Sequence, residues 1–247
     1  MLEMHWREVL ELLARLLRYP NEQTVQAAES LYVILLHEVP LAARAIAAFG
    51  ERCERSSLEE LEEIYTRTFE INSKCAPEIG WHLFGEEFTR GMLLVRLREE
   101  LERYGIPETT ELPDHITHVL ALVAAMPPEE ADRFVPACLY PALQTMRASA
   151  ERMNSPYLHV LACLDEVVRH QWGSFIEAST ETTCQPADGA DPLHAFPVLD
   201  APHEPCTGCG PVIDPRSLYG EDDVPRSIDE LDLPTDPRRG AIGRREP

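Results

Sequence analysis

The chain has 247 residues, of which 44% are hydrophobic and 26% are charged, close to the averages for soluble globular proteins. A chain of this length holds one large domain or two small ones, and its apolar content is sufficient for a packed core. The 43 acidic residues outnumber the 22 basic ones and give a formal net charge of -21, which disfavours nucleic acids and anionic lipid surfaces as partners.

The same charge attracts polypeptides that carry arginine, but it is a poor environment for a phosphorylated ligand unless a local cationic pocket compensates. The longest apolar runs, residues 31–36 and 118–126, are much shorter than the roughly 20 residues that cross a bilayer. Glu3 and Glu8 stand where a secretion signal would be cationic. Seven cysteines, an odd count, fit free thiols in a reducing compartment. We therefore expect a cytoplasmic protein with a polypeptide partner, no direct membrane insertion and no bound cofactor.

Helical periodicity dominates the first two thirds of the chain. Apolar residues at three- and four-residue spacing in residues 9–17 predict a first helix that ends before Pro20. A second helix is predicted over residues 22–37, and a third, rich in alanine, begins after Pro40 and fades near Gly50. Three successive helices with short connections are therefore expected at the start.

A fourth helix is predicted from Ser57, which is followed three residues later by Glu60 in the pattern of a capping box. Residues 71–85 break the helical rhythm with asparagine, proline and glycine but keep large apolar groups, which predicts an ordered connector. A helix resumes over residues 86–104, with acidic residues near its positive N-terminal end and Gly105 just past its last turn.

The remaining elements are also predicted to be helices. Pro113 and Asp114 suit the first turn of a helix that runs to residue 126, and the next helix starts at Pro128. A last helix begins at residues 154–156 and ends at about residue 172 or residue 175. Because no alternating strand pattern of useful length is present, the predicted fold class is all-α, with one bundle-like domain over residues 1–176.

The composition changes after about residue 180, where more than half of the 21 prolines lie. Residues 177–247 are therefore predicted to be an extended or disordered, acidic, Pro-rich tail. The tail contains a single CxxC pair, Cys206 and Cys209, and further candidate zinc or redox groups at Cys184, His194 and His203. One CxxC pair without a second is a weak signal, and an unstructured segment is the favoured interpretation.

His115 and His118 lie one helical turn apart and invite a metal or acid–base interpretation. A di-iron centre in a helical bundle needs Glu-x-x-His on two helices, and the sequence contains none. It also lacks the glycine-rich phosphate loops and the Gly-x-Ser-x-Gly turn of common enzymes. A structural or peptide-contacting role is favoured for both histidines, but a metal-binding or redox-switch protein that uses them, or Cys206 and Cys209, stays open as the alternative.

Large apolar residues surround the connector. Isolated aromatic residues belong more often to a core than to a binding site. The mixed faces of the neighbouring helices nevertheless predict a groove that accepts an amphipathic helix of another chain. The predicted lining consists of Phe69, Ile79, Trp81, Leu83, Phe84, Leu94, Leu97, Val119 and Leu122.

Several short motifs occur in order along the chain. They are Ala14-Arg-Leu-Leu-Arg-Tyr-Pro20, Tyr65-Thr-Arg-Thr-Phe-Glu70, His82-Leu-Phe-Gly-Glu86 leading to Arg90-Gly91, Tyr104-Gly105, and Glu111-Leu-Pro-Asp-His115. In order and spacing they resemble the nitrate reductase delta subunits, or NarJ-type molybdenum-cofactor assembly chaperones, of the TorD-like superfamily of redox enzyme maturation proteins. The resemblance spans residue 14 to about residue 126.

The resemblance implies an all-helical chaperone without enzymatic activity. Its client would be the N-terminal segment of the apo catalytic subunit of a molybdopterin oxidoreductase of the nitrate reductase type. The chaperone would prevent premature membrane attachment, permit insertion of the molybdenum cofactor and the iron–sulfur cluster, and then leave. The resemblance implies a partner-binding region at Phe84, Glu86, Arg90, Pro113, Asp114 and His115, to which we add His118 and the predicted groove.

Overall fold

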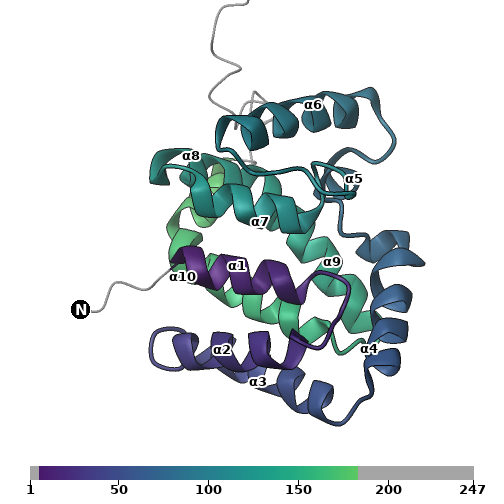
Figure 1. Ribbon diagram of the computed structural model, residues 1–247. Helices are drawn as coiled ribbons and strands as arrows, with labels where there is room; N and C mark the ends of the chain where they lie inside the picture. The colour runs from purple at the N-terminus through teal and green to yellow at the C-terminus, as the bar shows by residue number, and fades with distance from the viewer. Residues whose placement is uncertain (1–5, 183–247) are drawn as a thin grey trace, which may run out of the picture. The chain divides into compact units, whose positions relative to one another are not determined.

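The computed structural model describes residues 6–182, and every regular element among them is a helix (Figure 1). The first elements are α1 Trp6–Leu16, α2 Thr24–Leu35, α3 Pro40–Glu54, α4 Leu58–Tyr65, the π-helix η1 Thr66–Glu70, the 3-10 helix η2 Ser73–Cys75, α5 Ile79–Phe84 and α6 Phe88–Arg103. They are followed by α7 Ile116–Ala125, α8 Pro128–Phe134, the π-helix η3 Val135–Leu139, α9 Tyr140–Arg152 and α10 Leu158–Thr182. The predicted all-α fold class is confirmed.

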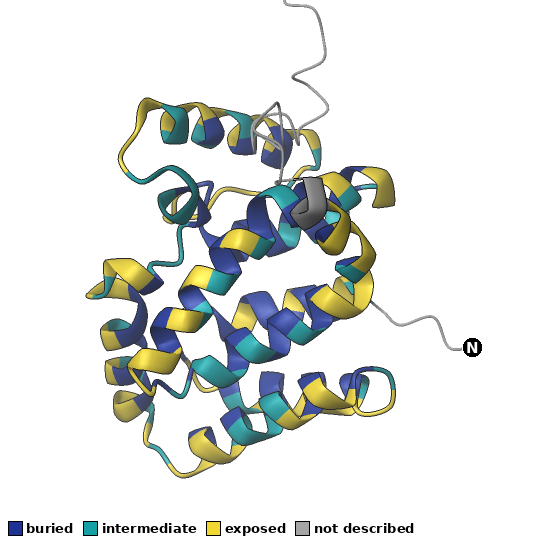
Figure 2. Ribbon diagram, turned by 180° about the vertical axis from the view of Figure 1, so that it is seen from behind, coloured by how far each residue is buried: buried dark blue, intermediate teal, exposed yellow. Residues whose placement is uncertain are grey.

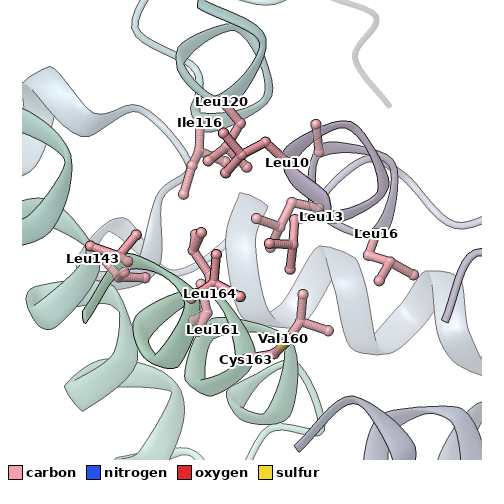
Figure 3. Close-up of a cluster of buried hydrophobic side chains, with 14 of the residues drawn as sticks. Leu10, Leu13, Leu16, Ile116, Leu120, Leu143, Val160, Leu161, Cys163 and Leu164 are labelled. Carbon is pink, nitrogen blue, oxygen red and sulfur yellow. The ribbon is translucent and has the colours of Figure 1, made fainter. Parts of the chain in front are cut away.

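α1 lies between α2 and α7 and carries much of the core (Figure 1). Its apolar residues at three- and four-residue spacing face inward, and Leu10 and Leu13 are almost completely buried. In Figure 3 these leucines meet Leu120 of α7 on one side and Leu161 and Leu164 of α10 on the other. Each buried leucine contributes about 1.5–3 kcal/mol relative to an exposed one, so the buried leucines of α1 stabilise its position between α2 and α7.

A cluster of aromatic rings joins α3, α4 and η1 to the start of α10. The Tyr157 ring centroid lies 5.0 Å from that of Phe69, 5.2 Å from that of Phe49 and 5.6 Å from that of Tyr65. All four side chains are buried. Phe69 is therefore a core residue, and the prediction that it lines a binding groove is wrong for this structure.

Two predicted helix ends have the expected geometry. Ser57 Oγ accepts a hydrogen bond from the Glu60 N–H at 3.2 Å, and Glu60 Oε2 accepts one from the Ser57 N–H at 3.2 Å. Gly105 has a positive φ of 65°, and the following Ile106 N–H donates to the Leu101 carbonyl at 2.8 Å. A glycine in this left-handed conformation ends α6 at little steric cost. The predicted capping box and the predicted glycine stop are confirmed.

Other predicted boundaries differ from the structure. α3 continues past Gly50 to Glu54. An added Cβ at Gly50 would lie 3.8 Å from Ala28 Cβ, an ordinary van der Waals contact, so Gly50 is a helical residue that faces α2. Part of the predicted connector forms α5. α7 begins at Ile116, so Pro113 and Asp114 precede the helix.

The last helix, α10, reaches Thr182 and so extends past the predicted domain boundary at residue 176. The rest of the predicted tail lies outside the described residues. Figure 2 shows that the buried residues of the helices face one another and that exposed residues cover the outer surfaces. Within residues 6–182, none of the helices combines the length and the apolar composition that a bilayer span requires.

Candidate partner-binding site

A buried ion pair joins α6 to the segment that precedes α7. Asp114 has no exposed surface, and its Oδ2 accepts a hydrogen bond from Arg90 Nε at 3.1 Å. Burial raises the pKa of Asp114, whereas the charge and the hydrogen bond of Arg90 oppose that change. Removing one partner of a buried pair typically costs about 3–5 kcal/mol, because the remaining charge is left uncompensated. The pair therefore anchors the N-terminal half of α6.

Gly80 in α5 allows this ion pair to form. A Cβ atom at Gly80 would lie 2.6 Å from Asp114 Oδ2, closer than real Cβ atoms approach their neighbours. Backbone hydrogen bonds hold the same region, since the Ile79 N–H donates to the Asp114 carbonyl and the Ile116 N–H donates to the Pro77 carbonyl, both at 2.8 Å. α5, residues 112–116 and the start of α6 therefore form one closely packed unit.

His115 caps the N-terminus of α7. Its Nδ1 accepts a hydrogen bond from the Thr117 N–H at 3.3 Å and lies 2.8 Å from Thr117 Oγ1. Burial lowers the pKa of His115 to about 4, and the charges of His118 and Arg18 act in the same direction. A neutral, capping imidazole is thus the stable form of His115 at neutral pH.

Protein groups surround both ring nitrogens of His118. Nδ1 donates to the Leu112 carbonyl at 2.9 Å, and Nε2 lies 3.1 Å from Thr109 Oγ1. Among residues 6–182, no group of three His, Cys, Asp or Glu residues has the arrangement to hold a metal ion. These contacts favour the structural interpretation of both histidines over the metal interpretation.

The predicted groove is not found among the described residues. Leu97, Val119 and Leu122, which the helical pattern predicts as its lining, have 0% exposed surface and pack in the core. Eight residues of the predicted binding site are buried: Phe69, Leu97, Pro113, Asp114, His115, His118, Val119 and Leu122. Ile79, which was predicted to line the groove, is buried as well. The other members of the predicted site reach the surface: Leu83, Phe84, Arg90 and Leu94 are partly buried, and Glu86 is exposed. Trp81, which was predicted to line the groove, is also partly buried. Helical periodicity shows that a helix has an apolar face, but it does not show whether that face packs against the same chain or against a partner. Here most of the predicted lining residues pack against other helices of the same chain.

The structure instead shows an exposed apolar face on α6, which sequence reasoning missed. Phe88, Met92 and Val95 are 85%, 41% and 52% exposed. They lie four and three residues apart and so form one stripe, which we call the α6 outer face. The buried leucines of α6, at positions 93, 97 and 101, occupy the opposite side of the helix. The sequence contains a signal for this exposed face, because the apolar residues of this helix form two stripes on different sides rather than one.

Charged residues flank the α6 outer face. Glu86 and Glu87 are exposed at the N-terminal end of the helix. One turn beyond Val95 lies Glu99, whose Oε2 accepts a hydrogen bond from Arg96 Nη1 at 2.9 Å. The N-terminal end of the stripe is therefore acidic, and it suits an apolar segment that carries arginine or lysine at one end.

A second polar anchor holds the C-terminal end of α6 against α8. Glu130, which is only 8% exposed, accepts hydrogen bonds from Arg103 Nη2 at 3.0 Å and from the Tyr104 hydroxyl at 2.6 Å. Burial and Glu130 together raise the pKa of Tyr104 to about 12, so that hydroxyl stays protonated and donates. With both ends anchored and the leucine side buried, α6 leaves its outer face exposed.

The cysteine chemistry predicted for the tail is not tested by the structure, because Cys184, His194, His203, Cys206 and Cys209 lie outside the described residues. In the described part, Cys53 and Cys75 are buried free thiols, and burial raises their pKa to about 11 and about 12. Thiols with raised pKa are poor nucleophiles and poor metal ligands at neutral pH. These two cysteines are therefore core residues.

Comparison with known proteins identifies the family. A family model described as "Nitrate reductase delta subunit" matches residues 35–162, just over half of the chain. The matched residues include both anchors and the α6 outer face. No curated protein was found to match the sequence. The helical fold agrees with the TorD-like type, and the chain belongs to the nitrate reductase delta subunit family, a family of chaperones for nitrate reductase maturation.

Proposed function

We propose that this chain binds the N-terminal segment of the apo catalytic subunit of a nitrate reductase-like molybdenum enzyme through the α6 outer face. It would hold this client in the cytoplasm while the molybdenum cofactor and the iron–sulfur cluster are inserted, and would release it before membrane attachment. The chain itself would catalyse no reaction and hold no cofactor. The observation that carries the proposal is the apolar stripe of Phe88, Met92 and Val95 on the surface of a family member.

The exposure of these residues needs an explanation. Single exposed apolar residues are normal on a protein surface, whereas apolar residues grouped on one face often mark an interaction site. A stripe with four- and three-residue spacing matches the apolar side of an amphipathic helix, which is a common mode of peptide recognition. Burial of Phe88, now 85% exposed, would contribute about 1.5–3 kcal/mol to binding.

Neighbouring groups would give the client its orientation. Glu86 and Glu87 are exposed at one end of the stripe and would meet arginine or lysine of the client. Leu83 and Phe84, at the end of α5, are partly exposed and would extend the apolar contact.

The buried members of the predicted site would act indirectly. Asp114 and Arg90 hold the start of α6, and His115 caps the neighbouring α7. Changes at Asp114 or His115 are therefore expected to displace or loosen the α6 outer face rather than to remove a client contact.

Reversible binding fits such a surface. Ordering a flexible client segment consumes part of the contact energy and leaves a moderate affinity. When the client folds around its cofactor, the segment becomes part of the client's own structure and the complex ends.

The test is client binding by a variant with Phe88→Ser, Met92→Ser and Val95→Ser. The substituted side chains are exposed, so the free energy of unfolding should change by about 0.5 kcal/mol or less at each site. The affinity for the client N-terminal peptide should fall by about a hundredfold or more in calorimetric titration. The matched control carries Val33→Ser, Leu36→Ser and Leu41→Ser, which are 67%, 39% and 58% exposed in the native chain, and it should bind normally.

Two results would count against the proposal in different ways. If the native chain does not capture the apo catalytic subunit of a nitrate reductase from the same genome, the proposed function is lost. If it does, and the α6 variant still binds as tightly as the control variant, the binding site lies elsewhere.

A further inference from the structure

A surface cavity of about 390 Å³ lies between the end of α1 and the start of α2. Its lining consists of Leu12, Arg15, Arg18, Asn21, Gln23, Thr24, Gln26, Ala27 and Ser30. Small-molecule sites typically have volumes of about 300–1,000 Å³, so the cavity is at the small end of that range. The lining residues come from α1, from α2 and from the loop between them.

The charge of this lining differs from that of the whole chain. Arg15 and Arg18 are its charged members, and none of the lining residues is acidic, although the chain has a formal net charge of -21. Neither arginine forms an ion pair with another described residue. A neighbouring cavity on α1 contains Arg7 and Arg15 together with Glu8 and Glu11, and its charges are balanced. The cavity between α1 and α2 is thus a local cationic site in an acidic protein.

The start of α2 adds to this positive character. Its first turn contains no acidic residue, and its N-cap residue Gln23 makes no side-chain capping hydrogen bond. The backbone N–H groups at a helix start carry a partial positive charge that favours an anion.

The cavity wall is also held in place by local hydrogen bonds. The Asn21 N–H donates to Thr24 Oγ1 at 3.0 Å, and the Gln23 N–H donates to Asn21 Oδ1 at 2.9 Å. A preformed wall reduces the entropy that a ligand loses on binding.

A purely structural explanation accounts for part of this arrangement. Arg15 lies in the last turn of α1, where a cation is favourable next to the negative end of the helix. That effect does not explain why Arg18 and neutral polar residues surround the same cavity without a carboxylate.

We propose that this cavity binds a small molecule through a phosphate or pyrophosphate group held between Arg15 and Arg18. The guanidinium groups match the geometry of phosphate oxygens and would form charge-assisted hydrogen bonds with them. The amide and hydroxyl groups of Asn21, Gln26 and Ser30 would bind the rest of the molecule. The site lies outside the residues that match the family model, and it is separate from the α6 outer face.

The test is calorimetric titration of the full chain with inorganic pyrophosphate, and separately with inorganic phosphate, at constant ionic strength. The native chain should bind one pyrophosphate saturably, and more tightly than phosphate. The variant Arg15→Gln/Arg18→Gln should lose roughly ten- to a hundredfold in affinity, because two charge-assisted contacts are removed.

The matched control is Arg7→Gln/Arg44→Gln, which removes the same charge from two other exposed arginines and should bind normally. Backbone amide shifts of residues 15–30 on addition of pyrophosphate should locate the site in the native chain without any substitution. Both variants should bind the client peptide normally, so this result is independent of the proposed function.

The proposal would be overturned if pyrophosphate does not bind saturably to the native chain. It would also be overturned if both double variants lose affinity equally, because that result indicates a general charge effect. Binding of a glutamate-rich peptide in this cavity, with no binding of pyrophosphate, would replace the phosphate ligand by an acidic polypeptide and would equally overturn the proposal.

Discussion

Asp114 and Gly80 illustrate how one residue without a side chain permits a buried charge. The carboxylate is buried and paired with Arg90, and Gly80 leaves the space that the carboxylate occupies. A Cβ at Gly80 would also lie 3.0 Å from Leu93 Cδ2, so the leucine side of α6 restricts the same space. The position of α6 therefore depends on a glycine that makes no side-chain contact.

We expect Gly80→Ala to destabilise the fold by about 1–3 kcal/mol, because overpacking forces neighbouring side chains or the backbone to move. The measurement is urea unfolding of the full chain. The control is Gly173→Ala in α10, where an added Cβ meets nothing within 4 Å. The control should be unchanged or stabilised by up to about 1 kcal/mol, because alanine favours a helix more than glycine does. A Gly80→Ala variant as stable as the native chain would show that the region adapts without strain.

His115 predicts a pH dependence of stability. Its pKa in the folded chain is about 4, below the value of about 6.5 for an unperturbed histidine, so the unfolded chain takes up a proton first as the pH falls. The stabilising contribution is fully present above about pH 6.5 and is lost as the pH falls to about 4. The difference between the two pKa values corresponds to about 3 kcal/mol.

The variant His115→Asn tests this prediction. Asparagine retains an acceptor for the start of α7 but does not titrate. Between pH 7 and pH 4.5 the free energy of unfolding of the native chain should fall by roughly 2–3 kcal/mol more than that of the variant. His37→Asn, at an exposed position, should behave like the native chain. Equal pH dependence in the native chain and in His115→Asn would mean that His115 is not the titrating group.

At the scale of elements, the helices could be predicted where local chemistry determines them. The capping box at Ser57 and the glycine at position 105 were sufficient to place one helix start and one helix end. α5 and the late start of α7 could not be predicted, because they depend on hydrogen bonds between residues 77–79 and residues 114–116, which are distant in the sequence.

The sequence predicted which part of the chain forms the candidate site, but it did not predict which side chains are exposed there. Arg90 and Asp114, which the family resemblance names, do meet in the structure. Which stripe of α6 reaches the surface is decided by α5 and α7, which bury the leucines and leave Phe88 exposed. A helix with two apolar stripes cannot reveal from its own sequence which one is covered.

At the scale of the whole molecule, the net charge of -21 acts on every encounter with a partner. A field of one sign accelerates the approach of an oppositely charged segment and is screened by salt over about 8–10 Å. Short-range apolar contacts respond less to salt and mainly set the dissociation rate. Charge and the α6 outer face should therefore affect different rate constants of client binding.

Stopped-flow binding of a client peptide that carries arginine should separate these effects. Raising NaCl from about 0.05 to 0.5 M should lower the association rate constant roughly tenfold or more and leave the dissociation rate constant nearly unchanged. Glu86→Gln/Glu87→Gln should reduce this salt dependence more than Glu22→Gln/Glu29→Gln, which removes the same charge from exposed positions near α2. Phe88→Ser should instead raise the dissociation rate constant by about tenfold or more at every salt concentration. An association rate that does not change with salt would mean that the acidic surface does not guide the client, and recognition would then rest on the apolar stripe alone.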